Sequence, residues 1–222
     1  MVIRLRDVLW TFVAVLALLF PFVVKYAAPD TSPALLLGSD SATLLYCITV
    51  VLAVLIGRKI HIVFTAIMTA SRLRESWFAI SPADCKIQPT EEFPSVFCAI
   101  MDRPASKLLL LTVIALADGR SRIFSPGITI LAGPEAPEGA AVTNAAKAFV
   151  REAQRALPRA VAISDHHRPR SDSVRFYIRT YDRLWVIEEK AAALMNCTSE
   201  NTALFAAADN LNTEIFRLAR LR

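Results

Sequence analysis

The residues with the most varied chemistry gather in one segment, residues 165–172, which reads Asp-His-His-Arg-Pro-Arg-Ser-Asp. Histidine and aspartate together can transfer protons or bind a metal ion. Adjacent histidines in an extended chain point in opposite directions, so one ion rarely binds both. The only other histidine in the chain is His61. We therefore predict a solvated loop here, with neither a catalytic nor a metal site.

A second group of side chains combines cations with aromatic rings. Between residues 174 and 181, apolar residues alternate with Arg175, Tyr177, Arg179 and Tyr181, the period of a β-strand with two different faces. Such a face can bind phosphates and stack on bases, or contact anionic lipid headgroups. It is also ordinary on an outward sheet surface, where arginine and tyrosine pair across strands. These interpretations stay open at this point.

No sequence motif adds a nucleophile or a cofactor. The chain has six glycines without a glycine-rich phosphate loop, and H-E-x-x-H and G-x-S-x-G are absent. The carboxylate pairs at 91–92 and 188–189 are neighbours in sequence rather than groups converging on one bond. Cys85, Cys98 and Cys197 form no C-x-x-C pair. We expect no catalytic residue, no cofactor and no metal.

The first 70 residues differ in composition from the rest. They hold five basic and three acidic side chains, and two runs, residues 8–24 and 42–57, carry no charge. Seventeen helical residues span about 26 Å, close to the roughly 30 Å hydrocarbon core of a bilayer. We predict a two-helix transmembrane hairpin over residues 1–57, with helices at about 8–27 and 42–57. A cleavable signal peptide is the alternative for the first run, but no typical cleavage site follows it.

Residues 58–76 predict an amphipathic juxtamembrane helix. Arg58, His61, Thr65, Thr69 and Arg72 recur at intervals of three and four residues, which places them in one polar stripe. The alternative is a long second helix, continuing to about residue 74, whose lower part packs on its own soluble domain.

Basic residues predict the orientation of the hairpin. Two arginines precede the first run, one lysine lies in the linker, and four cations follow the second run: Arg58, Lys59, Arg72 and Arg74. Short basic flanks stay in the cytoplasm. Both termini should therefore be cytoplasmic, in the inner membrane of a bacterium.

Residues 77–222 predict one α+β domain. A buried strand over 107–117 and a turn at Asp118-Gly119 precede a returning strand, which contains residues 123–124, is irregular at Pro126 and resumes at 128–131. A helix at 140–157, strands at 174–181 and 184–188, and a helix at about 202–221 follow, and one or two strands are expected between 79 and 101. The result is an antiparallel sheet with helices on one face.

The last helix carries a seam that resembles a coiled coil in its spacing. Leu204, Ala208, Leu211, Ile215 and Leu218 follow one another at intervals of four and three residues. The seam either contacts a partner helix or packs on the domain's own sheet.

Together these features predict a non-enzymatic integral membrane subunit or scaffold of a larger membrane assembly. Its partners would be membrane lipids and other membrane subunits or a second copy of the chain. The net charge of +3 after residue 70, from 20 basic and 17 acidic side chains, does not indicate nucleic acid. The alternative is a membrane-tethered enzyme or a ligand- or nucleic-acid-binding module. The candidate interaction residues are Arg58, Lys59, His61, Arg72, Arg74, Arg175, Tyr177, Arg179, Tyr181, Leu204, Leu211, Ile215 and Leu218.

Overall fold

The computed structural model describes residues 39–106, 109–125, 128–134 and 139–220. The chain divides into two units, residues 1–64 and 65–222. The helix predicted at 8–27 lies outside the described residues, so the two-helix hairpin is not shown.

Helix α2, Ser39–Ala79, is continuous over 41 residues. The segments expected as separate helices at 42–57 and 58–76 are therefore parts of one helix, as in the alternative of a long second helix. By length and composition, the part Val51–Ala79 can cross a membrane, because it contains an 18-residue window with a mean hydropathy of 1.9. Its apolar side chains are more than half exposed at Val51, Leu52, Val54, Leu55, Ile56, Ile60, Ile62, Val63 and Phe64.

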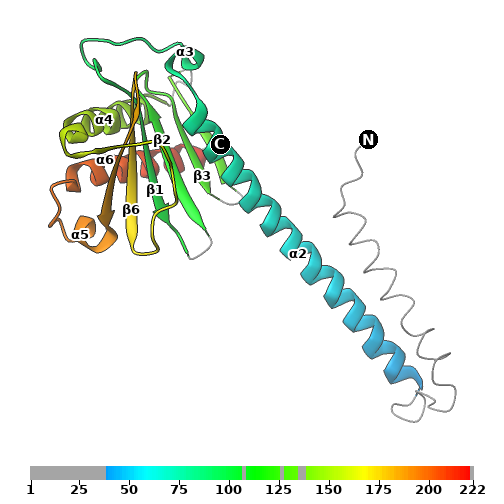
Figure 1. Ribbon diagram of the computed structural model, residues 1–222. Coiled ribbons are helices and arrows are strands. Elements are labelled where there is room, and N and C mark those ends of the chain that lie inside the picture. Colours follow the sequence, from blue (N-terminus) through cyan, green and yellow to red (C-terminus); the bar gives the residue numbers. More distant parts are fainter. Residues whose placement is uncertain (1–38, 107–108, 126–127, 135–138, 221–222) are drawn as a thin grey trace. The chain divides into compact units, whose positions relative to one another are not determined.

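Seven antiparallel strands form the sheet of the second unit (Figure 1). In chain order they are β1 Val96–Pro104, β2 Leu110–Leu116, β3 Ser121–Ser125, β4 Ile128–Ala132, β5 Val161–Ile163, β6 Ser173–Thr180 and β7 Leu184–Lys190. Their order across the sheet is β4-β3-β2-β1-β6-β7-β5, so β1 and β6 lie at its centre. The predicted antiparallel sheet is confirmed, and β1 is the strand expected between 79 and 101, although it extends to residue 104.

The segment after the Asp118-Gly119 turn differs from the prediction. Gly119 adopts a positive φ of 91° and turns the chain from β2 into β3. We expected a single returning strand with an irregularity at Pro126, and this is wrong. Ser125 pairs with Ile128, so β3 and β4 are two antiparallel strands joined by a reversal of the chain. Proline followed by glycine is typical of a turn, and the apolar residues on both sides hid that signal.

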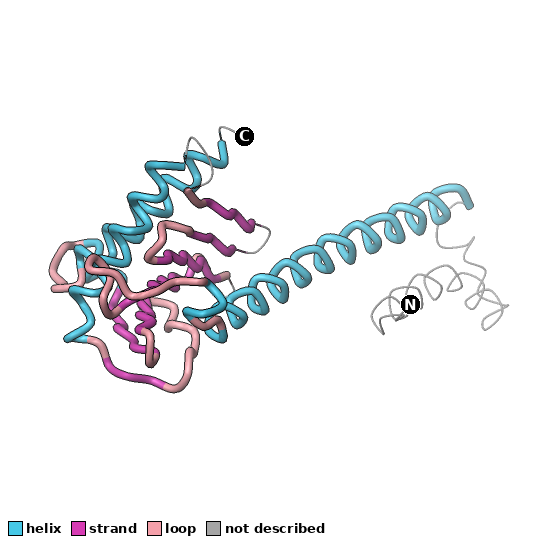
Figure 2. The backbone as a smooth tube through the Cα atoms, turned by 90° about the horizontal axis from the view of Figure 1, so that it is seen from above, coloured by secondary structure: helices cyan, strands magenta, loops and turns pink. Residues whose placement is uncertain are grey.

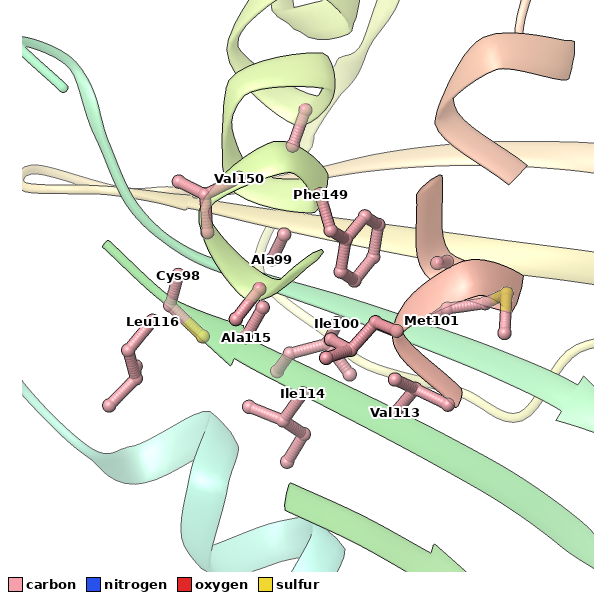
Figure 3. Packing of buried hydrophobic residues seen from close by; sticks show 14 of the residues in the cluster. Cys98, Ala99, Ile100, Met101, Val113, Ile114, Ala115, Leu116, Phe149 and Val150 are labelled. Atoms are coloured by element: carbon pink, nitrogen blue, oxygen red, sulfur yellow. The ribbon is translucent and has the colours of Figure 1, made fainter. Parts of the chain in front are cut away.

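Helices α4, Ala140–Ala156, and α6, Thr202–Arg220, pack side by side against one face of the sheet (Figures 1 and 2). Figure 3 shows Phe149 and Val150 of α4 packed over β1 and β2, where Ala99 and Ala115 leave room for them. Two short helices, α3 Pro82–Cys85 and α5 Ala191–Met195, and a 3-10 turn at Leu157–Arg159 lie in the connections.

The prediction of helices on one face is incomplete. The last turns of α2, in the same unit as the sheet, contact the opposite face, because Arg74 bonds Asp102 and the Phe78 ring meets the Tyr177 ring edge-on at 4.8 Å. Since both faces are covered, all seven residues of β2 are buried.

Candidate functional site

A buried ion pair joins the last turns of α2 to the sheet. Arg74 is 4% exposed and Asp102, on the central strand β1, is fully buried. Nε and Nη2 of Arg74 each lie 2.7 Å from Oδ2 of Asp102. The hydroxyl of Thr112 donates to Oδ1 at 2.6 Å, from the position on β2 that pairs with Asp102. Both carboxylate oxygens thus have partners.

The remaining donors of Arg74 reach other segments. Nη2 donates to the carbonyl oxygen of His166 at 2.7 Å and to the hydroxyl of Tyr177 at 3.2 Å, while Nη1 donates to Glu75 at 3.0 Å. The guanidinium also lies 4.6 Å from the centroid of the Phe78 ring. Each nitrogen of the guanidinium therefore has a hydrogen-bond partner, which is the condition under which a buried charge is tolerated.

The protonation of this cluster depends on its internal partners. Burial raises the pKa of Asp102, and Arg74 and Thr112 oppose that rise. Burial likewise raises the pKa of Tyr177, so its hydroxyl keeps its proton at neutral pH and donates to the carbonyl oxygen of His167. Removing Arg74 would remove one of the groups that oppose the effect of burial, so the pKa of Asp102 should rise further.

The histidine segment is attached to this cluster. The His166 ring stacks on Phe78 with centroids 4.4 Å apart, and its Nε2 contacts Glu75. The side chain of His167 points elsewhere and is 79% exposed. The two histidines diverge as predicted, but the segment is docked on α2 rather than fully solvated. Across the described residues, no three His, Cys, Asp or Glu side chains come together as a metal site would require.

The Arg/Tyr face of β6 is covered by this same chain. Arg175 donates to Glu188 at 2.8 Å and to the carbonyl oxygen of His167 at 2.9 Å. Tyr177 is fully buried, and Tyr181 is half-buried. Arg179 donates to the carbonyl oxygens of Trp77 and Phe78, at 3.1 and 2.7 Å.

These two carbonyls belong to the last turn of α2, where a helix has no further backbone donors of its own. Arg179 therefore satisfies the C-terminal end of α2. Two of the four side chains of this predicted binding face, Tyr177 and Arg179, therefore contact α2.

The predicted seam of the last helix is buried within the domain. Leu204, Ala208, Leu211, Ile215 and Leu218 are at most 4% exposed, and α6 packs chiefly on α4. The coiled-coil spacing therefore describes a contact between two helices of one domain.

The remaining predicted residues lie along α2. Arg58, Lys59 and Arg72 are exposed and His61 is half-buried, whereas Arg74 is separated from them by its burial against the sheet. Among the cysteines, burial raises the pKa of Cys85 and of Cys98, which disfavours their reactive thiolates.

No protein-family model, curated protein or solved structure matches the chain. The function must therefore be argued from its own residues.

Sequence reasoning missed Asp102, Thr112 and Phe78 as members of this cluster. One signal for Asp102 was present, because it follows six apolar residues, 96–101, that are typical of a buried strand. A carboxylate in such a place requires a buried partner. The sequence pattern does not identify the cation that pairs with Asp102.

Proposed function

We propose that the chain is a non-enzymatic integral membrane subunit or scaffold of a larger assembly in a bacterial inner membrane. In this proposal a transmembrane hairpin with both termini in the cytoplasm carries the α+β domain as an interaction domain.

The observation that best supports the proposal is that the last turns of the candidate membrane helix pack against the sheet of the domain. α2 runs without a break from its exposed apolar stretch to the Arg74 cluster. A tethered module that acts on soluble partners is usually joined by a flexible linker rich in glycine, serine or proline. Here the end of the helix covers one face of the sheet, so the domain would lose part of its own structure without the helix. A domain whose sheet is covered in part by the end of such a helix suits a protein that positions other subunits.

The exposed part of α2 supports the membrane role. Nine apolar side chains between Val51 and Phe64 are more than half exposed, and soluble monomers rarely leave large apolar surfaces uncovered. Lipid, a neighbouring subunit or a second copy of the chain would cover these side chains.

A fractionation experiment tests the proposal. The full chain should stay in the membrane fraction after an alkaline wash, and native mass measurement after mild extraction should find additional subunits or copies. Val51→Arg should reduce insertion, because an arginine near the centre of the uncharged run 42–57 costs about 2.5–3.5 kcal/mol. Val161→Arg, at an exposed position of the domain, is the matched control and should not. A soluble or strictly monomeric wild-type protein would contradict the proposal.

Orientation can be tested with the exposed Cys197. In a Cys47→Ala variant, a membrane-impermeant maleimide should label Cys197 only after spheroplasts are permeabilised, because Cys85 and Cys98 are buried. Labelling in intact spheroplasts would place the domain on the other side.

A further inference from the structure

A cleft on the α2 side of the sheet contains a cation that is not paired within the described chain. The cleft has a volume of about 330 Å³ and lies over β2, β3 and β4, with Trp77 of α2 as one wall. Its apolar lining includes Leu116 and Leu131, and its two cations are Arg120 and Arg122.

The two arginines differ in their partners. Arg120 donates to Asp118 at 2.6 Å and to the carbonyl oxygen of Cys85 at 2.6 Å, so its charge is already paired. Arg122 has no hydrogen bond or ion pair to any residue that the structure describes, and its buried Nε lacks a partner. Burial lowers the pKa of Arg122. A half-buried guanidinium without a counterion is a costly arrangement that an oxyanion would relieve.

Aromatic rings hold Arg122 in place. Its guanidinium carbon lies 5.1 Å from the centroid of Trp77 and 5.9 Å from that of Phe124. Cation–π contacts of this kind restrict the side chain while leaving the edges of the guanidinium free to donate. Because the rings already restrict the Arg122 side chain, a ligand that binds it loses less side-chain conformational entropy.

We infer that this cleft binds a small amphipathic organic anion. Its carboxylate accepts hydrogen bonds from Arg122, and its apolar body lies against Trp77, Leu116 and Leu131. The volume is within the range of small-molecule sites, which combine an apolar lining with few polar groups that orient the ligand. This inference is independent of the membrane role.

Binding of 2-naphthoate to the full chain in nanodiscs tests the inference. Equilibrium dialysis with empty nanodiscs as the blank should show saturable binding at one site per chain. Arg122→Gln should weaken it at least about tenfold, since hydrogen bonds to charged groups contribute about 1.5–3 kcal/mol. The matched control is Arg183→Gln, which removes another arginine over a tryptophan, Trp185, outside the cleft. It should leave binding unchanged.

A second variant guards against misfolding of the first. Leu131 is 57% exposed at the rim of the cleft, so Leu131→Glu should fold and repel the anion. Val161→Glu, at the other edge of the sheet and 66% exposed, is its control. The neutral analogue 2-naphthylmethanol should not distinguish wild type from Arg122→Gln.

Three results would overturn the inference. These are no saturable binding, equal binding by Arg122→Gln and wild type, or inorganic phosphate binding as tightly as 2-naphthoate.

Discussion

Breaking the Arg74–Asp102 pair should cost more stability than breaking a surface ion pair between described residues. The first perturbation is Arg74→Met, which keeps an unbranched apolar stem and removes the charge. Asp102, fully buried, would keep only the hydroxyl of Thr112. Removing one partner of a buried pair costs about 3–5 kcal/mol. In a protein of this size that corresponds to a fall in melting temperature of roughly 6–20 °C.

The reverse perturbation, Asp102→Leu, should cost less. Arg74 would retain Glu75, the carbonyl oxygen of His166 and the hydroxyl of Tyr177. The double variant Arg74→Met, Asp102→Leu should be more stable than Arg74→Met alone, because no buried charge is left unpaired. The coupling between the two sites should be about 2 kcal/mol or more.

Hydrogen exchange of β1 and β2 peptides, measured by mass spectrometry on the full chain in nanodiscs, reports the opening free energy of the sheet. The control is Arg217→Met. Arg217 pairs with Glu214 at 2.9 Å on the surface of α6 with its side chain 59% exposed, and its loss should cost less than about 1 kcal/mol. A cost below about 1 kcal/mol for Arg74→Met, or a double variant equal to the sum of the singles, would refute this account.

Three further predictions concern the domain. Gly119→Ala should lower the melting temperature, since φ is 91° and a Cβ would lie 2.4 Å from Thr143 Cγ2; circular dichroism of the full chain checks this, and an unchanged melting temperature would contradict it. Phe149→Ala should cost about 3–5 kcal/mol in the same assay because it opens a cavity in the core, and a loss below about 1 kcal/mol would contradict that packing.

Although burial acts to raise the pKa of Glu188, Ser173 and Arg175 outweigh it and lower that pKa, so stability from Glu188 is present above the unfolded value of 4.5 and is lost as the pH falls through the folded value. Glu188→Gln should flatten the fall in stability between about pH 5 and pH 3, and an identical pH profile would show that Glu188 does not contribute.

Elements with a strong period were predictable from the sequence. The apolar face of 140–157 became α4, and the seam of 202–221 became α6, because burial of one helical face requires that spacing. The apolar run before Asp118 likewise became β2. Between β3 and β4, apolar residues lie on both sides of residues 125–127, and the local pattern did not distinguish one strand from two.

The candidate site was less predictable because its partners are far apart in sequence. Arg74 lies 28 residues before Asp102 and 103 before Tyr177. Arg74 and its exposed neighbour Arg72 are both arginines, so the local sequence pattern places both in a basic segment beside the membrane. The alternation of β6 correctly separates its two faces, but periodicity does not show that α2 covers the polar one. Long-range packing decides both matters.

The polar character of the junction has a geometric consequence. Leu73, Trp77 and Phe78 could make similar apolar contacts if α2 were rotated on the sheet, because such contacts are not directional. Arg74 could not, because a shift of one residue turns a helix side chain by about 100° and would break its bonds to Asp102 and His166 together. Buried ion pairs are best attested as devices that specify register. The Arg74 cluster therefore favours one rotational setting of the last turns of α2 on the sheet.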